Sequence, residues 1–253
     1  MSVANIIGVP LGTWVGQQMG WRASFWSVSA LGLLGTLAVV IWIPSIQIGQ
    51  NSRLRQELRV LKSSQVQLTF LMTILSFVGI FAAFTFIAPI LTEITGFSSE
   101  QITPILLLYG VGLTMGNTIA GKLANRSIMP TAIGGLTLSA LVMGLLYFTM
   151  HVKWAAVVTI LLWGLASFGH VPALQMRIIA KAKGAPNLAS SLNISAFNLG
   201  IALGSSLGAG VIHSGLGLQV VPAAAAAFTI VAILVAVIGW KRDEGASIED
   251  AKA

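Results

Sequence analysis

The only Asp, Glu, Lys, Arg or His side chain well inside an apolar stretch of this sequence is His170. It lies in the apolar run 154–176 and shares a helical face with Trp163, Ser167 and Leu174. Histidine changes its charge near physiological pH, and an ionisable group inside an apolar span is a candidate for function. Two interpretations stay open: His170 binds protons or substrate, or it is a hydrogen-bond donor in helix packing.

A polar stripe follows the run 188–212, where Ser191, Ser195, Asn198 and Ser205 recur on one helical face. A polar face in an apolar environment must meet protein or water. We therefore predict that Ser195 and Asn198 line a cavity, with hydrogen bonding between helices as the alternative. Asn193, on the opposite face, is expected to form hydrogen bonds within a packed glycine seam.

Aromatic side chains form another stripe, in the run 68–92. Phe77, Phe81 and Phe84, together with Phe70, fall within about 60° of one another around a helix. Such a stripe fills a core or faces lipid, or it forms the wall of a cavity that suits planar or greasy ligands.

Glycines recur every four residues in two runs, at Gly8, Gly12 and Gly16 and at 200, 204 and 208. This spacing removes side chains from one helix face and lets a neighbouring backbone approach closely. The contact is either static packing or a sliding surface. Pro10 frees the carbonyl four residues earlier, so we expect a bend in the first run.

The sequence contains few residues in patterns that would support catalysis or metal binding. The sequence has no Cys, which excludes disulfides, thiolate nucleophiles and cysteine-ligated metal sites. It also lacks a P-loop, an H-E-x-x-H or G-x-S-x-G motif, and paired carboxylates inside any apolar run. We therefore expect no enzyme, no catalytic residue, no metal site and no cofactor.

The elements that position these residues are apolar helices. Only 8% of the 253 residues are charged and 56% are hydrophobic, which excludes a water-soluble enzyme and a disordered chain. Eight runs are long enough to cross a lipid bilayer. They are 2–19, 24–43, 68–92, 102–121, 130–150, 154–176, 188–212 and 218–240. They are continuously apolar, so we predict an all-α membrane protein with eight transmembrane helices rather than a barrel.

Basic residues set the predicted topology. All but two of the 14 Lys and Arg residues lie in alternate loops or the C-terminal tail, the exceptions being Arg22 and Lys153. The positive-inside rule then places both termini in the cytoplasm of a multi-pass inner-membrane protein. The net charge of +7 lies between the apolar runs, so we expect the lipid bilayer as partner and no nucleic acid. The connection 44–67, with Leu54, Leu58 and Leu61 at helical spacing, is either a short amphipathic helix on the membrane or a solvated linker.

Several motifs resemble those of one transporter family. Residues 121–126, with Gly121, Asn125 and Arg126, resemble the G-x-L-x-D-R loop motif of the major facilitator superfamily, with Asn125 in place of the usual acid. Gly8, Pro10 and Gly12 resemble the glycine–proline motif of its antiporters, although the spacing differs by one residue. Residues 20–26 resemble the G-W-R-x-x-F-W start of helix six in drug/proton antiporters, and residues 187–200 resemble helix eleven of the sugar-efflux branch.

The resemblance implies helices five to twelve of a twelve-helix major facilitator fold, with the first four helices missing. The segments would be 1–43 as the last two helices of the N-terminal half, 44–67 as linker, 68–240 as the C-terminal six-helix half and 241–253 as tail. It implies proton-coupled efflux of a small organic solute, drug-like, sugar or nucleoside, by alternating access. Phe77, Phe81, Phe84, Trp163, His170, Ser195 and Asn198 are the candidate cavity residues. Gly8, Pro10, Gly12, Gly16, Gly121, Asn125 and Arg126 form the candidate conformational motif.

The proton gradient would replace a cofactor as the energy source. The missing helices, or a second copy of the chain, are expected partners. A non-transporting truncated remnant or membrane scaffold is the alternative function.

Overall fold

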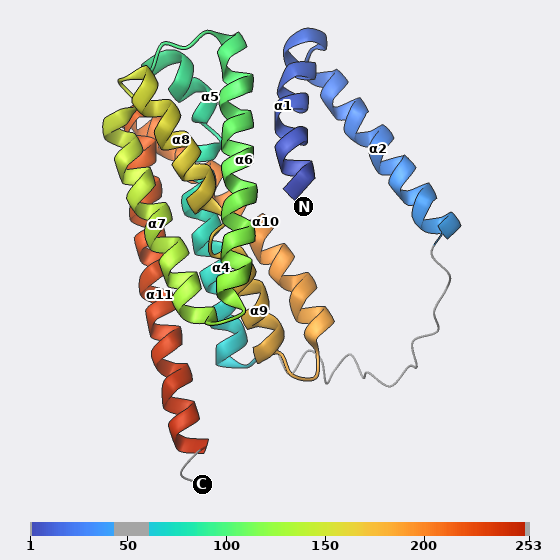
Figure 1. Ribbon diagram of the computed structural model, residues 1–253, viewed down its shortest axis with the longest axis vertical. Coiled ribbons are helices and arrows are strands. Elements are labelled where there is room, and N and C mark those ends of the chain that lie inside the picture. The colour runs from blue at the N-terminus through green and yellow to red at the C-terminus, as the bar shows by residue number, and fades with distance from the viewer. Residues whose placement is uncertain (1, 43–60, 251–253) are drawn as a thin grey trace.

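The computed structural model describes residues 2–42 and 61–250, and these residues form helices without strands (Figure 1). The first two helices are α1 (Ser2–Met19) and α2 (Trp21–Trp42). The others are α4 (Ser64–Phe84), α5 (Ile87–Pro89), η1 (Ile90–Ile94), α6 (Ser99–Ala124), α7 (Ile128–Thr149), α8 (Lys153–Ser167), α9 (Val171–Lys181), α10 (Pro186–Val211), η2 (Ile212–Leu216), η3 (Leu218–Val220) and α11 (Val221–Asp250).

The predicted all-α membrane fold is confirmed. Among the described residues, 7 helical stretches are long and apolar enough to cross a membrane. They correspond to seven of the eight predicted runs, beginning with Trp21–Trp42. The remaining run, 2–19, forms α1, but it is not among the seven. Its polar residues Asn5, Gln17 and Gln18 lower its apolar character.

Two of the predicted spans are broken inside, and a proline accounts for each break. Helix α4 ends at Phe84, and the chain resumes as α5 and η1 up to Ile94. Pro89 lacks an N–H, and its ring crowds the carbonyl of Thr85. In the same way Pro172, in the first turn of α9, separates α8 from α9 around Phe168. These breaks place irregular backbone inside the bundle.

Helices α4 and α6–α11 form a six-helix bundle in which α8 and α9 together make one span (Figure 1). Helix α4 packs against α10 and α11, α6 packs against α8, and α7 packs against α8 and α11. The glycines of α10 allow its close approach to α4, because a Cβ on Gly204 would lie 2.6 Å from the carbonyl oxygen of Val78. A Cβ on Gly200 would lie equally close, 2.6 Å from the carbonyl oxygen of Ile74. The seam at 200, 204 and 208 is therefore a packing contact within the bundle.

Helices α1 and α2 lie beside the bundle and form a hairpin at Gly20, whose φ is +82°. Helix α1 packs against α6, and Gln17 Nε2 donates a hydrogen bond to the carbonyl oxygen of Ser99 (3.2 Å). Helix α2 has no buried residue and diverges from the bundle in Figure 1. Its apolar side chains are therefore uncovered within the described part of the chain.

The predicted linker 44–67 falls mostly outside the described residues, and with it Leu54 and Leu58 of the predicted amphipathic helix. At its described end, Leu61 packs against a buried cluster that includes Val66. Ser63 caps α4 by accepting a hydrogen bond from the Val66 N–H (3.3 Å). The helices also extend beyond the predicted limits, since α4 begins at Ser64 and α11 continues to Asp250.

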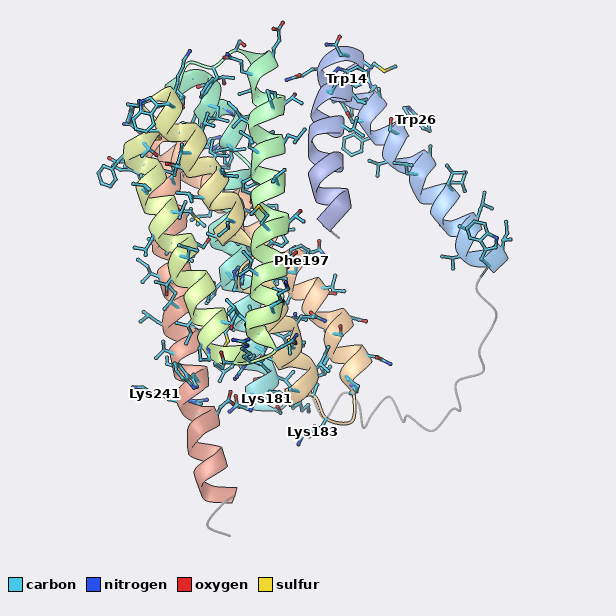
Figure 2. All side chains as sticks on the ribbon, viewed as in Figure 1. Trp14, Trp26, Lys181, Lys183, Phe197 and Lys241 are labelled. Carbon is cyan, nitrogen blue, oxygen red and sulfur yellow. The ribbon has the colours of Figure 1, made fainter. Side chains whose placement is uncertain are left out.

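Basic side chains gather at one end of the molecule. Figure 2 shows Lys181, Lys183 and Lys241 together at this end, while Trp14 and Trp26 lie at the opposite end. We call the first of these the basic end. Lys181 is the last residue of α9, Lys183 lies in the α9–α10 turn, and Lys241 lies in the C-terminal part of α11. Their common position follows from the up-and-down course of the helices.

Candidate functional site

The aromatic stripe of α4 is part of a larger cluster of rings inside the bundle. The ring of Phe81 lies 6.0 Å from that of Phe77 and 5.6 Å from that of Phe84. Phe84 in turn lies 6.1 Å from Trp163 and 5.0 Å from Tyr109. The structure thus brings four predicted cavity residues together. Trp163 is fully buried in the core, whereas Phe77 also reaches a pocket.

This pocket lies between α4, α9 and α10 and has a volume of about 260 Å³. Three aromatic rings form its apolar wall: Phe77 from α4, Phe168 from the α8–α9 break, and Phe197 from α10. The rings of Phe77 and Phe197 meet at 4.1 Å and 82°. An apolar cleft with a few fixed polar groups is the usual form of a small-molecule site.

A chain of hydrogen bonds supplies the fixed polar groups of the pocket. The Oγ1 of Thr73 donates to Asn193 Oδ1 (2.8 Å), and Asn193 Nδ2 donates to Gln175 Oε1 (3.0 Å). Gln175 Nε2 then donates to Ser190 Oγ. Thr73, Gln175 and Asn193 all line the pocket. Because each amide is held by its neighbour, the polar side of the pocket has a defined orientation.

Asn193 lies where the sequence predicted it. It is buried on the glycine face of α10 and forms hydrogen bonds to Thr73 of α4 and Gln175 of α9. Sequence reasoning did not assign it to a pocket, and it did not single out Thr73, Gln175 or Phe168. The signal available in the sequence was Pro172. This proline separates α8 from α9, and the ring of Phe168 at the break lines the pocket beside α4.

His170 lies in the same break and is completely buried. Its ring packs 5.9 Å from that of Phe77, outside the residues that line the pocket. Neither ring nitrogen has a hydrogen-bond partner among the described residues. In this arrangement His170 supports the pocket wall through Phe77, and its role in proton or substrate binding stays a prediction.

Ser195 and Asn198 lie elsewhere on α10 and do not line this pocket. Both are exposed, and both donate to their own helix: Ser195 Oγ to the carbonyl oxygen of Ser191 (3.4 Å) and Asn198 Nδ2 to that of Ile194 (2.9 Å). Their place in a larger cavity stays a prediction.

The predicted conformational motif falls on two separated elements. In α1, an added Cβ on Gly8 or Gly12 would meet nothing within 4 Å, and one on Gly16 would lie 3.3 Å from Ser24 Oγ. Helix α2 therefore approaches this face near Gly16, and Ser24 Oγ also donates a hydrogen bond to the carbonyl oxygen of Gly12 (3.2 Å), whereas Gly8 stays open. Helix α1 continues past Pro10 without interruption up to Met19.

The second part of the motif ends α6 at the basic end. A Cβ on Gly121 would also meet nothing within 4 Å, and Asn125 follows the helix as its C-cap. The backbone N–H of Asn125 donates to the carbonyl oxygen of Gly121 (3.3 Å). Arg126 is exposed.

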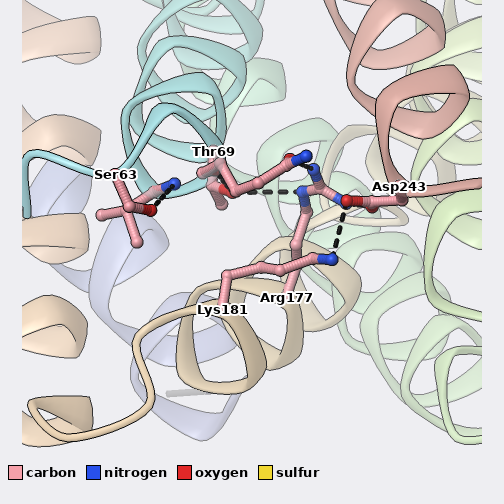
Figure 3. Close-up of polar contacts among 7 residues, drawn as sticks. Ser63, Thr69, Arg177, Lys181 and Asp243 are labelled. Carbon is pink, nitrogen blue, oxygen red and sulfur yellow. Dashed lines mark hydrogen bonds and ion pairs between the residues drawn. The ribbon is translucent and has the colours of Figure 1, made fainter. Parts of the chain in front are cut away.

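A buried ionic cluster at the basic end was missed by the sequence analysis. The prediction that Arg177 belongs to a loop is wrong, because α9 continues to Lys181 and buries Arg177 to 2% exposure. Its guanidinium donates to the carboxylate of Asp243, to Thr69 Oγ1 (3.1 Å) and to Gln65 Oε1 (2.9 Å), as Figure 3 shows. This cluster joins the ends of α4, α9 and α11.

Lys181 adds an ion pair to the same carboxylate, with its Nζ 2.7 Å from Asp243 Oδ1. The i, i+4 spacing of Arg177 and Lys181, together with an acid just beyond the last apolar run, was the available signal.

A protein-family model matches most of this chain. The model of the Major Facilitator Superfamily matches residues 1–187. The chain belongs to the Major Facilitator Superfamily. Its pocket lies in the bundle that the superfamily resemblance predicts as the C-terminal half.

The chain is similar to several transport proteins. The inner membrane transport protein YdhP of Escherichia coli (strain K12) is 39% identical over 234 residues, which is 92% of this chain and 60% of the relative. A probable sugar efflux transporter of Helicobacter acinonychis is 30% identical over 218 residues, 85% of this chain and 56% of the relative. A chloramphenicol resistance protein of Streptomyces lividans is 32% identical over 209 residues, 80% of this chain and 53% of the relative. The chain therefore spans about three fifths or less of these relatives.

Proposed function

We propose that this protein transports a small organic solute out of the cell, as a transporter and not an enzyme. The observation that carries the proposal is the pocket between α4, α9 and α10, with three aromatic rings on one side and the Thr73–Asn193–Gln175 chain on the other. Membership of the superfamily supports transport, and the similarity to a probable sugar efflux transporter and a chloramphenicol resistance protein supports the efflux direction.

In this proposal the rings of Phe77 and Phe197 hold the planar or apolar part of the solute. Asn193 and Gln175 form hydrogen bonds to its polar part, since their amides are already oriented by the chain of hydrogen bonds. Helices from outside the 253 residues, or a second copy of the chain, supply the opposite wall and cover α2. The glycine face of α1 is then a surface on which the two halves move during alternating access.

The energy source we propose is the proton gradient, without a cofactor. No Asp or Glu occurs inside an apolar run of this sequence, so the carboxylate that carries the proton would belong to the helices that complete the transporter. His170, well inside the apolar run 154–176, remains the candidate for a proton response within this chain.

We further propose an inner-membrane location with the basic end in the cytoplasm. The grouping of Lys181, Lys183 and Lys241 at one end supports this orientation, because basic residues concentrate in cytoplasmic loops. Both termini would then be cytoplasmic.

The test is accumulation of chloramphenicol and of a sugar analogue in an efflux-deficient bacterial host. Cells would express the chain alone, or together with a four-helix N-terminal fragment of a relative. We expect accumulation to fall only when the fragment is present. A protonophore, which collapses the proton gradient, should restore accumulation to the level of cells without the transporter.

Two variants locate the activity in the pocket. Phe77→Ala and Asn193→Ala should each restore at least half of the lost accumulation at unchanged expression. Phe148→Ala, on an exposed position of α7, and Asn187→Ala, on the exposed start of α10, are the matched controls and should leave efflux intact. Equal efflux in all four variants would refute the pocket. No efflux in either arrangement would favour the alternative of a non-transporting membrane scaffold.

A further inference from the structure

A second hollow lies on the outside of the bundle, between α6 and α7, and has a volume of about 350 Å³. Its floor is formed by Leu165 and Gly169, from α8 and the α8–α9 break. Its rims are Ile119 and Leu123 on α6 and Leu138 on α7, whose side chains are 42–49% exposed. It is separate from the pocket between α4, α9 and α10.

Close helix contacts on either side create this groove. A Cβ on Gly112 would lie 2.5 Å from the carbonyl oxygen of Leu161, so α6 lies directly on α8. A Cβ on Gly135 would lie 2.6 Å from the carbonyl carbon of Gly169, so α7 lies directly on the α8–α9 break. Since both helices are pulled onto the same neighbour, a trough remains between them. A Cβ on Gly134 would meet nothing within 4 Å, which leaves the trough open.

The groove is apolar along its length and basic at its end. The Oγ1 of the lining residue Thr131 already donates a hydrogen bond to the carbonyl oxygen of Ser127 (2.6 Å). The groove follows α6 from Gly116 to Leu123, about 10 Å, or about two thirds of the hydrocarbon depth of one leaflet. Lys122 and Arg126 are both exposed, and they are the sequence neighbours of the lining residues Leu123 and Ser127 at the basic end of the groove.

The segment 121–126 contains no Asp or Glu that could pair with Lys122 or Arg126. Asn125 stands where the resembling loop motif has an acid, so the segment carries two positive charges and no negative one. In the described part of the chain, no ion pair involves Lys122 or Arg126. An apolar groove in the bilayer that ends in two cations matches the two parts of an anionic phospholipid.

We propose that this groove binds one anionic phospholipid of the leaflet at the basic end. An acyl chain lies in the trough between α6 and α7, and the phosphate is held by Lys122 and Arg126. The lipid would fill the trough between α6 and α7 above Leu165 and Gly169, and so hold these two helices in place beside the break that carries Phe168.

The experiment measures lipid retained by the purified 253-residue chain in native mass spectrometry, with phosphatidylglycerol and phosphatidylcholine of identical acyl chains as probes. We expect one retained phosphatidylglycerol, at an apparent affinity at least about fivefold above that of phosphatidylcholine. Dihexanoyl phosphatidylglycerol, which has the same headgroup and short chains, should bind more weakly than the long-chain lipid. Equal retention of the two headgroups, equal binding of the short-chain lipid, or no retained lipid would overturn the proposal.

Variants separate the groove from its charged end. Gly134→Leu places a side chain in the open trough and should reduce retention at least fivefold. Gly144→Leu is the matched control on the same helix, because a Cβ there also meets nothing within 4 Å and the residue lies outside the groove. Lys122→Gln with Arg126→Gln should reduce retention of phosphatidylglycerol to the level of phosphatidylcholine.

The corresponding pair at the opposite end, Arg22→Gln with Lys153→Gln, should leave retention unchanged. Full retention in Gly134→Leu would contradict the placement of the acyl chain. Displacement of the lipid by millimolar inorganic phosphate would instead indicate a simple anion site and would also overturn the proposal.

Discussion

Replacement of Asp243 by Ala should be the most destabilising single change at the basic end. The carboxylate pairs with Arg177, whose side chain is 2% exposed, and with Lys181, which is 33% exposed. Without Asp243, the buried guanidinium keeps only the neutral acceptors Thr69 and Gln65. A buried charge without a counter-charge is strongly unfavourable.

The expected cost follows from this burial. Removing one partner of a buried ion pair costs about 3–5 kcal/mol. Because Asp243 itself is 17% exposed, water reaches the site in part and we expect the lower limit, about 3 kcal/mol. That amount lowers the folding equilibrium constant more than about 100-fold. Lys181→Gln removes only the more exposed partner and should cost less than about 1 kcal/mol.

The assay is reversible unfolding of the purified chain in mixed micelles, followed by tryptophan fluorescence. The double variant Arg177→Met/Asp243→Leu should recover most of the loss, since it leaves no unpaired charge. A loss below about 1 kcal/mol for Asp243→Ala, or a double variant no more stable than the single one, would refute the reasoning.

Three further outcomes can be checked directly. Gly204→Ala should destabilise by about 1–3 kcal/mol because its Cβ would meet the α4 backbone, whereas Gly210→Ala, with nothing within 4 Å, should be neutral or slightly stabilising; unfolding titrations that fail to separate the two would contradict the packing argument. His170→Leu should raise stability by about 1 kcal/mol, since it removes two buried nitrogens without partners among the described residues, and a loss of stability would mean that His170 has a partner. Reporter fusions after Lys183 should report cytoplasm and a fusion near Glu100 the outside; the reverse pattern would overturn the orientation.

The helices themselves could be predicted from the sequence because apolar length alone determines membrane spans. The glycine seam and the place of Asn193 within it were predicted from helical periodicity, whereas the six-helix bundle was predicted from the family resemblance. The breaks at Thr85 and Phe168 were missed although Pro89 and Pro172 are visible in the sequence. Hydropathy averages over these prolines, and their effect appears only when the i−4 carbonyl is considered.

The pocket could be predicted only in part. Phe77 was a candidate because it belongs to an aromatic stripe, but Phe168 and Gln175 come from other elements with no shared periodicity. Their proximity depends on tertiary packing around the α8–α9 break. The burial of Arg177 was missed for a related reason, since its partner Asp243 is 66 residues away in sequence.

The central claim, that the pocket binds the transported solute, is tested most directly by protection of a single cysteine. The chain has no native Cys, so Ile194→Cys provides a unique thiol at the pocket, and Leu199→Cys provides a control on the same helix outside it. The two positions are comparably exposed, at 48% and 50%. We predict that the solute exported in the accumulation assay slows maleimide labelling at position 194 at least threefold and leaves position 199 unchanged. Equal labelling rates at position 194 with and without saturating solute would contradict the account.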